Sequence, residues 1–310
     1  MELSEMHPSF EGIFASTVVP MQADERIDFE ALARHQQTVA GHPGIRGLLI
    51  NGHAGENFTL SAGEKQDVVR CAREAVGPES RLICGIYAES SADAADQARQ
   101  AETAGADALL VFPPFSWALG HTVDSALAHH RAIRAQSRLP LMLYQASVNA
   151  GQMAYTPDTL AALAQLEGVV AIKEGSWETA RYEATLRRIQ ADAPHVGVMP
   201  SGDEHLLSTF LLGGTGSQVS IAALDPEAVV QLWDAVRQGD LARARAAHAR
   251  LYPLVKAVYG TAPGTRATAR LKTCLSLRGL IPAPTMRAPM TASDPAETQW
   301  LRSVLDEAGL

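Results

Sequence analysis

The chain has 310 residues, of which 46% are hydrophobic and 19% charged, and its formal net charge at pH 7 is −8. A chain of this length can bury a large core, either as one α/β domain or as two smaller ones. The acidic balance, with no basic run longer than Arg187-Arg188, excludes the electrostatic footprint of a nucleic-acid-binding protein. No apolar stretch approaches the length of a membrane span, and three scattered cysteines fit reduced thiols, so we expect a soluble cytoplasmic protein.

Short β-rich segments recur along the chain with helical patterns between them. The apolar or alanine positions of residues 29–40 and 91–106 recur at i, i+3 and i+4, and the second segment ends at a glycine, as helices often do. The predicted strands are residues 13–19, 45–50, 81–86, 107–112, 139–144, 169–173, 196–199 and 214–221.

Eight alternating β-α units indicate a (β/α)₈ barrel. Strands that read as continuous apolar runs are buried on both faces, which is typical of a parallel sheet, and eight such units fill the usual length of a closed barrel. A doubly wound open sheet is the alternative. After Asp225-Pro226 the β-rich segments cease. We therefore predict a barrel over residues 1–225 and a C-terminal helical region over residues 226–310 that packs on it.

In such a barrel the chemistry lies at the C-terminal ends of the strands. Lys173 and Tyr144 end two successive predicted strands. Taken alone, a strand-end lysine is more often solvated or ion-paired, and a strand-end tyrosine is as often a core residue. A desolvated lysine would have a lowered pKa and a lone pair available to form a Schiff base with a ketone. A neighbouring phenol could pass the protons of that reaction.

The stretch NGHAGE, residues 51–56, follows the second predicted strand. Its glycines permit close backbone approach, and from the residues alone the loop could be a phosphate cradle, a metal site or a pocket for another anion. His53 either donates a proton or hydrogen bond or only fills volume, and both roles stay open. Glu56 is expected to accept backbone N–H groups at the start of the next helix. We expect His129-His130 on a solvated helix face, and the scattered histidines disfavour a metal site.

Five motifs in chain order resemble those of the dihydrodipicolinate synthase and N-acetylneuraminate lyase superfamily: GxxGE, LPLMLYQAS, VVAIKEGS, SGDE and GGTG. The tail LKTCLSLRGLI…MRAPM resembles the C-terminal helical region of that family. The resemblance implies that Lys173 forms an imine with pyruvate or a larger 2-oxo acid and that Tyr144 relays protons. It also implies that the backbone of Gly52, His53, Ala54 and Gly55 holds the substrate carboxylate, and that the protein is a homotetramer without a metal or other cofactor.

Three features depart from the synthase branch of that family. His53 and Ala54 stand where the synthases carry two threonines, Ser116 stands where they carry a second tyrosine, and Asn149 stands where an arginine binds the carboxylate of the second substrate. Each departure removes part of the synthase chemistry that the resemblance implies. Efficient synthase activity would need another cation, such as Arg181 or one from a neighbouring subunit.

The predicted function is therefore a Schiff-base-forming lyase, an aldolase or a dehydratase of a hydroxylated 2-oxo acid, rather than an efficient dihydrodipicolinate synthase. Gly202 in SGDE and Gln218 in the last strand complete the predicted substrate site, Gln218 as a polar wall. True synthase activity and a 2-oxo-acid-binding protein without turnover are the alternatives. A metal-dependent barrel aldolase is disfavoured by the histidine spacing.

Overall fold

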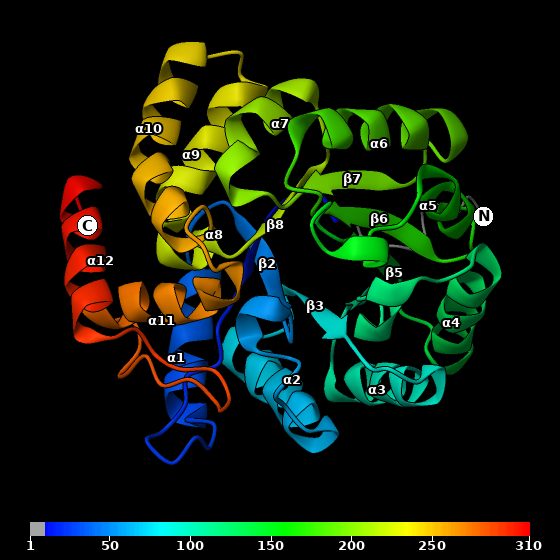
Figure 1. The fold of residues 1–310 in the computed structure, drawn as a ribbon, viewed down its shortest axis with the longest axis horizontal. Helices are drawn as coiled ribbons and strands as arrows, with labels where there is room; N and C mark the ends of the chain where they lie inside the picture. The colour runs from blue at the N-terminus through cyan, green and yellow to red at the C-terminus, as the bar shows by residue number, and fades with distance from the viewer. Residues whose placement is uncertain (1–9) are drawn as a thin grey trace.

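The structure, a computed structural model, describes residues 10–310. Eight parallel strands lie in the order β7-β6-β5-β4-β3-β2-β1-β8. The two end strands also meet, because the Thr215 amide before β8 donates to the Val198 carbonyl of β7 at 3.1 Å. The predicted (β/α)₈ barrel is thus confirmed (Figure 1). The strands are β1 (Gly12–Ser16), β2 (Ile45–Ile50), β3 (Arg81–Ile86), β4 (Ala108–Val111), β5 (Leu141–Gln145), β6 (Val169–Glu174), β7 (Gly197–Pro200) and β8 (Gly216–Val219).

The helices follow the strands and begin where the sequence supplies a cap. Asp28 accepts the amide of Ala31 at the start of α1, and α3 ends at Gly105, whose φ of 102° favours glycine. The helices are α1 (Phe29–Ala40), α2 (Ala62–Val76), α3 (Ser91–Ala104), α4 (Val123–Gln136), α5 (Pro157–Ala164), α6 (Thr179–Asp192), α7 (Leu206–Leu212), α8 (Ile221–Leu224), α9 (Pro226–Arg237), α10 (Leu241–Val258), α11 (Ala267–Leu277) and α12 (Pro295–Glu307).

Two layers of apolar side chains hold the barrel together. The larger layer lies between the strands and the surrounding helices. The smaller layer fills the barrel interior, and its members are Phe10, Phe14, Leu49, Ile83, Ala108, Leu110, Phe112, Met142, Ala171 and Met199. Successive side chains of a strand alternate between these layers. Lys173, two residues after Ala171, therefore faces the barrel axis, whereas Glu174 faces the helices.

The helices after residue 225 pack on one side of the barrel, where Figure 1 shows α12 at the outer edge. Helix α9 contacts β1 and α7 and thereby completes the ring around the strands, and α10 packs along α9. Helix α11 contacts the loop after β2, and α12 packs on α10 and α11. The division into two regions at residue 225 stays a prediction. No helix that the structure describes is both long and apolar enough to cross a membrane.

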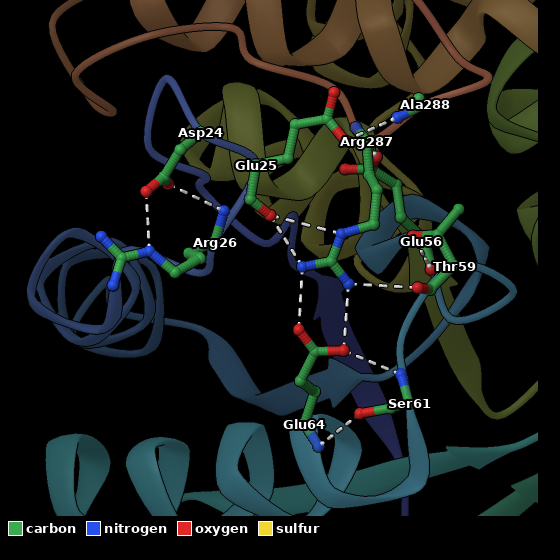
Figure 2. A network of polar contacts seen from close by, with 9 residues as sticks. All are labelled: Asp24, Glu25, Arg26, Glu56, Thr59, Ser61, Glu64, Arg287 and Ala288. Carbon is green, nitrogen blue, oxygen red and sulfur yellow. Dashed lines mark hydrogen bonds and ion pairs between the residues drawn. The ribbon is translucent and has the colours of Figure 1, made fainter.

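A polar network centred on Arg287 ties the C-terminal region to the loop after β2 and to the start of α2 (Figure 2). The carboxylate of Glu56 forms an ion pair with Lys272 of α11 in which both side chains are 0% exposed. Glu56 also accepts the backbone amide of Arg287 at 3.3 Å. The Arg287 guanidinium binds both carboxylate oxygens of Glu64, at 2.8 and 3.0 Å, and the carbonyl of Glu25 at 2.7 Å. Segments more than 200 residues apart in sequence are thus held together around Glu56.

Two sequence-based expectations are wrong. Ser61, not Glu56, caps α2 by accepting the amide of Glu64. Glu56, whose φ is 54°, instead pairs with Lys272 and accepts the amide of Arg287 in the C-terminal region. His129 and His130 of α4 are buried rather than solvated. Their rings pack in an aromatic cluster under the loop after β4, so the helix face that they occupy is an inner one.

Candidate active site

Lys173 and Tyr144 lie side by side at the C-terminal ends of β6 and β5. The two residues pair in register between the strands, and the Nζ atom of Lys173 is 5.9 Å from the centre of the Tyr144 ring. Both side chains are half-buried at the mouth of the barrel. Burial lowers the pKa of Lys173 to about 8, although the nearby carboxylate of Asp203 acts in the opposite direction. Burial, with a smaller contribution from Glu174, raises the pKa of Tyr144 to about 12.

His53 lies beside this pair and joins it to an aromatic wall. Its ring meets that of Tyr144 edge-on at 5.4 Å and stacks on Phe112 at 4.3 Å. Burial, and then the positive charge of Lys173, lowers the pKa of His53 to about 3. The imidazole is therefore neutral near pH 7, which suits it to hydrogen bonding rather than to supplying a proton from an imidazolium.

The loop after β2 carries His53 in a single turn of 3₁₀ helix, η2 (His53–Gly55). The amide of Gly55 donates to the carbonyl of Gly52 at 3.0 Å. The amides of His53 and Ala54 lie at the start of the turn and have no acceptor within it. The approach of β3 to this loop requires a glycine, because a Cβ atom at Gly85 would lie 2.0 Å from the carbonyl oxygen of Asn51. The close approach of Gly85 to Asn51 thus fixes where the loop after β2 begins at the mouth of the barrel.

The opposite side of the mouth is formed by the ends of β7 and β8. Asp203, the first residue of η5 (Asp203–His205), is buried and accepts the amide of Ile221 at 2.9 Å. Burial raises the pKa of Asp203 to about 7, although the Ile221 amide and the charge of Lys173 lower it. Next to Ile221, the Ser220 hydroxyl shares a hydrogen bond with that of Tyr259, which follows α10. The strand that carries Lys173 thus lies between β5, which carries Tyr144, and β7, which precedes Asp203.

The other residues predicted to bind substrate are dispersed. Ser116 is exposed, and its amide donates to Glu89 at 3.1 Å. Asn149 is exposed in the turn after β5. Gly202 is buried directly before Asp203. Gln218 is 0% exposed inside the barrel, where its amide nitrogen lies 3.1 Å from the sulfur of Met142. The substrate-binding roles of Gly52, Ala54, Gly55, Ser116, Asn149, Gly202 and Gln218 stay predictions.

Arg181 lies on the helix side of the sheet. It lines a cavity of about 240 Å³ between α5 and α6, together with Gln145. Gln145 is the next residue after Tyr144 and therefore faces away from the barrel axis. The strands thus separate the guanidinium of Arg181 from the mouth that holds Lys173. Arg181 is therefore poorly placed to take the role of the arginine that was expected, by resemblance to the synthases, at the position of Asn149.

Sequence reasoning did not single out Asp203, Ser220 or Tyr259. Asp203 stands in the SGDE motif, which is the only local signal for this group, and Tyr259 belongs to a helical region with no motif around it. Their proximity depends on how α10 packs on the barrel. Within residues 10–310, no three His, Cys, Asp or Glu side chains gather closely enough to hold a metal ion.

The fold and this site define a (β/α)₈-barrel protein with a lysine and a tyrosine on neighbouring strand ends. A sequence profile of the dihydrodipicolinate synthetase family matches residues 9–308. The chain belongs to this family, whose members are lyases, and the resemblance seen in the sequence is confirmed.

Relatives with curated names align with nearly the whole chain. A 4-hydroxy-tetrahydrodipicolinate synthase of Methanoculleus marisnigri is 30% identical over 304 residues, covering 97% of this chain and 100% of the relative. A protein of Halobacterium salinarum named as an uncharacterized DapA-like lyase is 29% identical over 299 residues, covering 96% of this chain and 94% of the relative. Names within the family thus differ at similar identity.

Solved structures share the fold. Dihydrodipicolinate synthase from Thermotoga maritima has a TM-score of 0.85 at 26% identity, covering 97% of this chain and 99% of that one. YagE, a prophage protein of Escherichia coli K12 solved in complex with pyruvate, has a TM-score of 0.88 at 24% identity, covering 98% of this chain and 100% of that one. The barrel with its C-terminal helices is therefore the family's architecture.

Proposed function

We propose that this chain is a Schiff-base-forming lyase that cleaves or dehydrates a hydroxylated 2-oxo acid, with Lys173 as the nucleophile and Tyr144 as a proton relay. One observation carries the proposal. The register of β5 and β6 sets a lysine of lowered pKa beside a tyrosine at the mouth of a barrel. Membership of a lyase family supports the same reaction class.

The lowered pKa of Lys173 supplies the nucleophile. With a pKa of about 8, roughly one molecule in ten carries the neutral amine at pH 7, against a few in ten thousand for an unperturbed lysine. The amine attacks C2 of the 2-oxo acid, and the carbinolamine then loses water to give an iminium ion. Tyr144, protonated at this pH, donates the proton that the departing hydroxyl takes.

The iminium ion then accepts the electrons that the lyase reaction releases. In aldol cleavage the C4 hydroxyl loses its proton, the C3–C4 bond breaks, and its electron pair forms the enamine. In dehydration the C3 proton is lost to form the enamine, whose electrons then expel the C4 hydroxyl, and this hydroxyl takes up the proton released from C3 and leaves as water. The amides of His53 and Ala54 are the donors that the loop offers to the substrate carboxylate, and the neutral ring of His53 offers one further hydrogen bond.

Dihydrodipicolinate synthase activity is the second candidate, because curated relatives at 30% identity carry that name. Condensing pyruvate with aspartate semialdehyde requires the site to bind a second carboxylate. Asn149 can offer only a neutral hydrogen bond where an arginine would give a bidentate charged pair. Arg181 lies on the other side of the sheet from Lys173, so it does not supply the missing positive charge. The lyase of a hydroxylated 2-oxo acid is therefore the favoured assignment.

Reduction of the imine tests the proposal. Incubation with pyruvate and borohydride should add a stable mass to Lys173, located by mass spectrometry of peptides, and Lys173→Ala should carry no adduct. Lys256→Ala, which changes a lysine that is 55% exposed, is the matched control and should be modified like the wild type. An adduct on another residue, or full activity of Lys173→Ala, would refute the assignment of the nucleophile.

Two further measurements separate the alternatives. Activity on 4-hydroxy-2-oxo acids that survives EDTA but is lost with pyruvate and borohydride would exclude a metal-dependent aldolase. An adduct on Lys173 without turnover of any acid in a panel of 4-hydroxy-2-oxo and 3-deoxy-2-oxo acids would instead indicate a binding protein.

A further inference from the structure

The stretch that carries His53 is bounded by two residues in a left-handed conformation. Asn51 has φ of 51° and Glu56 has φ of 54°. Asparagine tolerates this conformation because its short polar side chain can bond locally, whereas the conformation is uncommon for glutamate. Backbone strain of this kind persists where surrounding contacts over-determine it, and it gathers at functional sites. The contacts of Glu56 therefore help to fix the turn from His53 to Gly55.

Glu56 closes that turn and is bonded through both its backbone and its side chain. Its amide donates to the carbonyl of His53 at 3.0 Å. Its carbonyl accepts the amide of Thr59 at 2.8 Å and the hydroxyl of the same residue at 2.9 Å. Its carboxylate pairs with Lys272 and accepts the amide of Arg287 at 3.3 Å. Glu56 thus links the turn to the C-terminal region.

Arg287 fastens this link to separate segments of the barrel (Figure 2). Its guanidinium donates to the carbonyl of Thr59 at 3.1 Å and to the carbonyl of Glu25, which lies between β1 and α1, at 2.7 Å. The same group binds both carboxylate oxygens of Glu64 in α2. A bidentate pair fixes orientation as well as distance. The backbone of Arg287, which reaches Glu56, is therefore held in place relative to the barrel.

We propose that Arg287 is a positioning residue, which holds Glu56 and thereby presents the amides of His53 and Ala54 to the substrate carboxylate. This inference rests on the proposed function, in which the turn binds that carboxylate. The ring of His53 lies 5.4 Å from that of Tyr144, so the turn borders the mouth of the barrel. The bonds of Arg287 reach the loop and its neighbours, so the residue acts on the carboxylate through the turn.

Loosening the turn should weaken carboxylate binding and leave the nucleophile unchanged. Hydrogen bonds from backbone amides to an ionised group depend on distance and alignment. Arg287→Met removes the guanidinium and keeps an apolar stem. It should raise the pyruvate concentration that half-saturates the borohydride adduct on Lys173 by about tenfold, since a misplacement that starts far from the chemistry can cost this much or more. Methyl pyruvate, whose ester carries no charge, should form its adduct at the wild-type concentration.

Arg266→Met is the matched control. Arg266 also lies in the C-terminal region, its side chain is 26% exposed against 17% for Arg287, and it too pairs with a glutamate, Glu297. Glu297 keeps Arg270 as a partner when Arg266 is replaced. Both half-saturating concentrations should therefore stay at their wild-type values in this variant.

A conservative variant secures the test. Arg287→Lys keeps the charge but loses the bidentate fork, so it should give a shift for pyruvate between those of the wild type and Arg287→Met. Circular dichroism establishes that each variant folds, and if Arg287→Met does not fold, Arg287→Lys decides the question.

The outcomes separate the positioning role from the proposed function. Unchanged half-saturation by pyruvate in the folded Arg287 variants, an equal shift for methyl pyruvate, or the same shift in Arg266→Met would overturn the positioning role. A wild type that forms its adduct equally well with both ketones would also overturn it, because the turn would then not bind the carboxylate. A wild type that forms no adduct would instead overturn the proposed function itself.

Discussion

Replacing Lys272 with methionine should destabilise the protein strongly. The Lys272–Glu56 pair is 0% exposed on both sides, and Lys272 also donates to the carbonyl of Thr285 at 2.8 Å. Removing one partner of a buried pair leaves an uncompensated charge, which costs about 3–5 kcal/mol. Methionine preserves most of the volume of lysine, so lost packing contributes little to this value.

The free energy of unfolding, measured in urea by circular dichroism, checks this magnitude. Lys256→Met is the matched control, because Lys256 is 55% exposed and pairs with Glu204 at 3.8 Å. An exposed pair of this kind contributes about 0.2–1 kcal/mol. The double variant Glu56→Gln with Lys272→Met should recover part of the loss, since no charge is then left buried. A loss for Lys272→Met as small as that for Lys256→Met would refute the reasoning.

Three other predictions concern pH, substrate and assembly. Burial lowers the pKa values of His35 and His130 to about 4, so below pH 6.5 the unfolded chain binds protons that the folded chain does not. The free energy of unfolding should therefore fall as the pH drops from about 6.5 to 4, by roughly 2 kcal/mol for each histidine at pH 5. Urea unfolding of His130→Phe should show a smaller fall over this range than the wild type. Equal falls in the two proteins would contradict this cause. The kcat/KM for condensing pyruvate with aspartate semialdehyde should lie at least about tenfold below that for the best 4-hydroxy-2-oxo or 3-deoxy-2-oxo acid. The reason is that a charged hydrogen-bonded pair is worth about 1–2 kcal/mol more than a neutral hydrogen bond. Efficient condensation would argue for the synthase. The family resemblance predicts a homotetramer, and a monomer in sedimentation at micromolar concentration would count against that prediction.

The strands could be read from the sequence because their signal is local. Continuous apolar runs with helical periods between them indicate a parallel barrel, and in such a barrel every strand delivers its last residues to the same mouth. Tyr144 and Lys173 could therefore be assigned to neighbouring strand ends, and the register between β5 and β6 agrees with this. Helix α1 likewise has its predicted bounds, since period and cap are both encoded within its own residues.

Only the tertiary structure decided which side chains from distant segments of the chain contact one another. Glu56 pairs with Lys272, 216 positions away, and no pattern around either residue signals that partner. Tyr259 reaches Ser220 only because α10 packs on the barrel, and the burial of His130 depends on the loop that covers α4. Local sequence specifies period, caps and strand ends. The long-range contacts that desolvate a charge or bring two hydroxyls together arise from the packing of whole elements, and they set the electrostatics of this site.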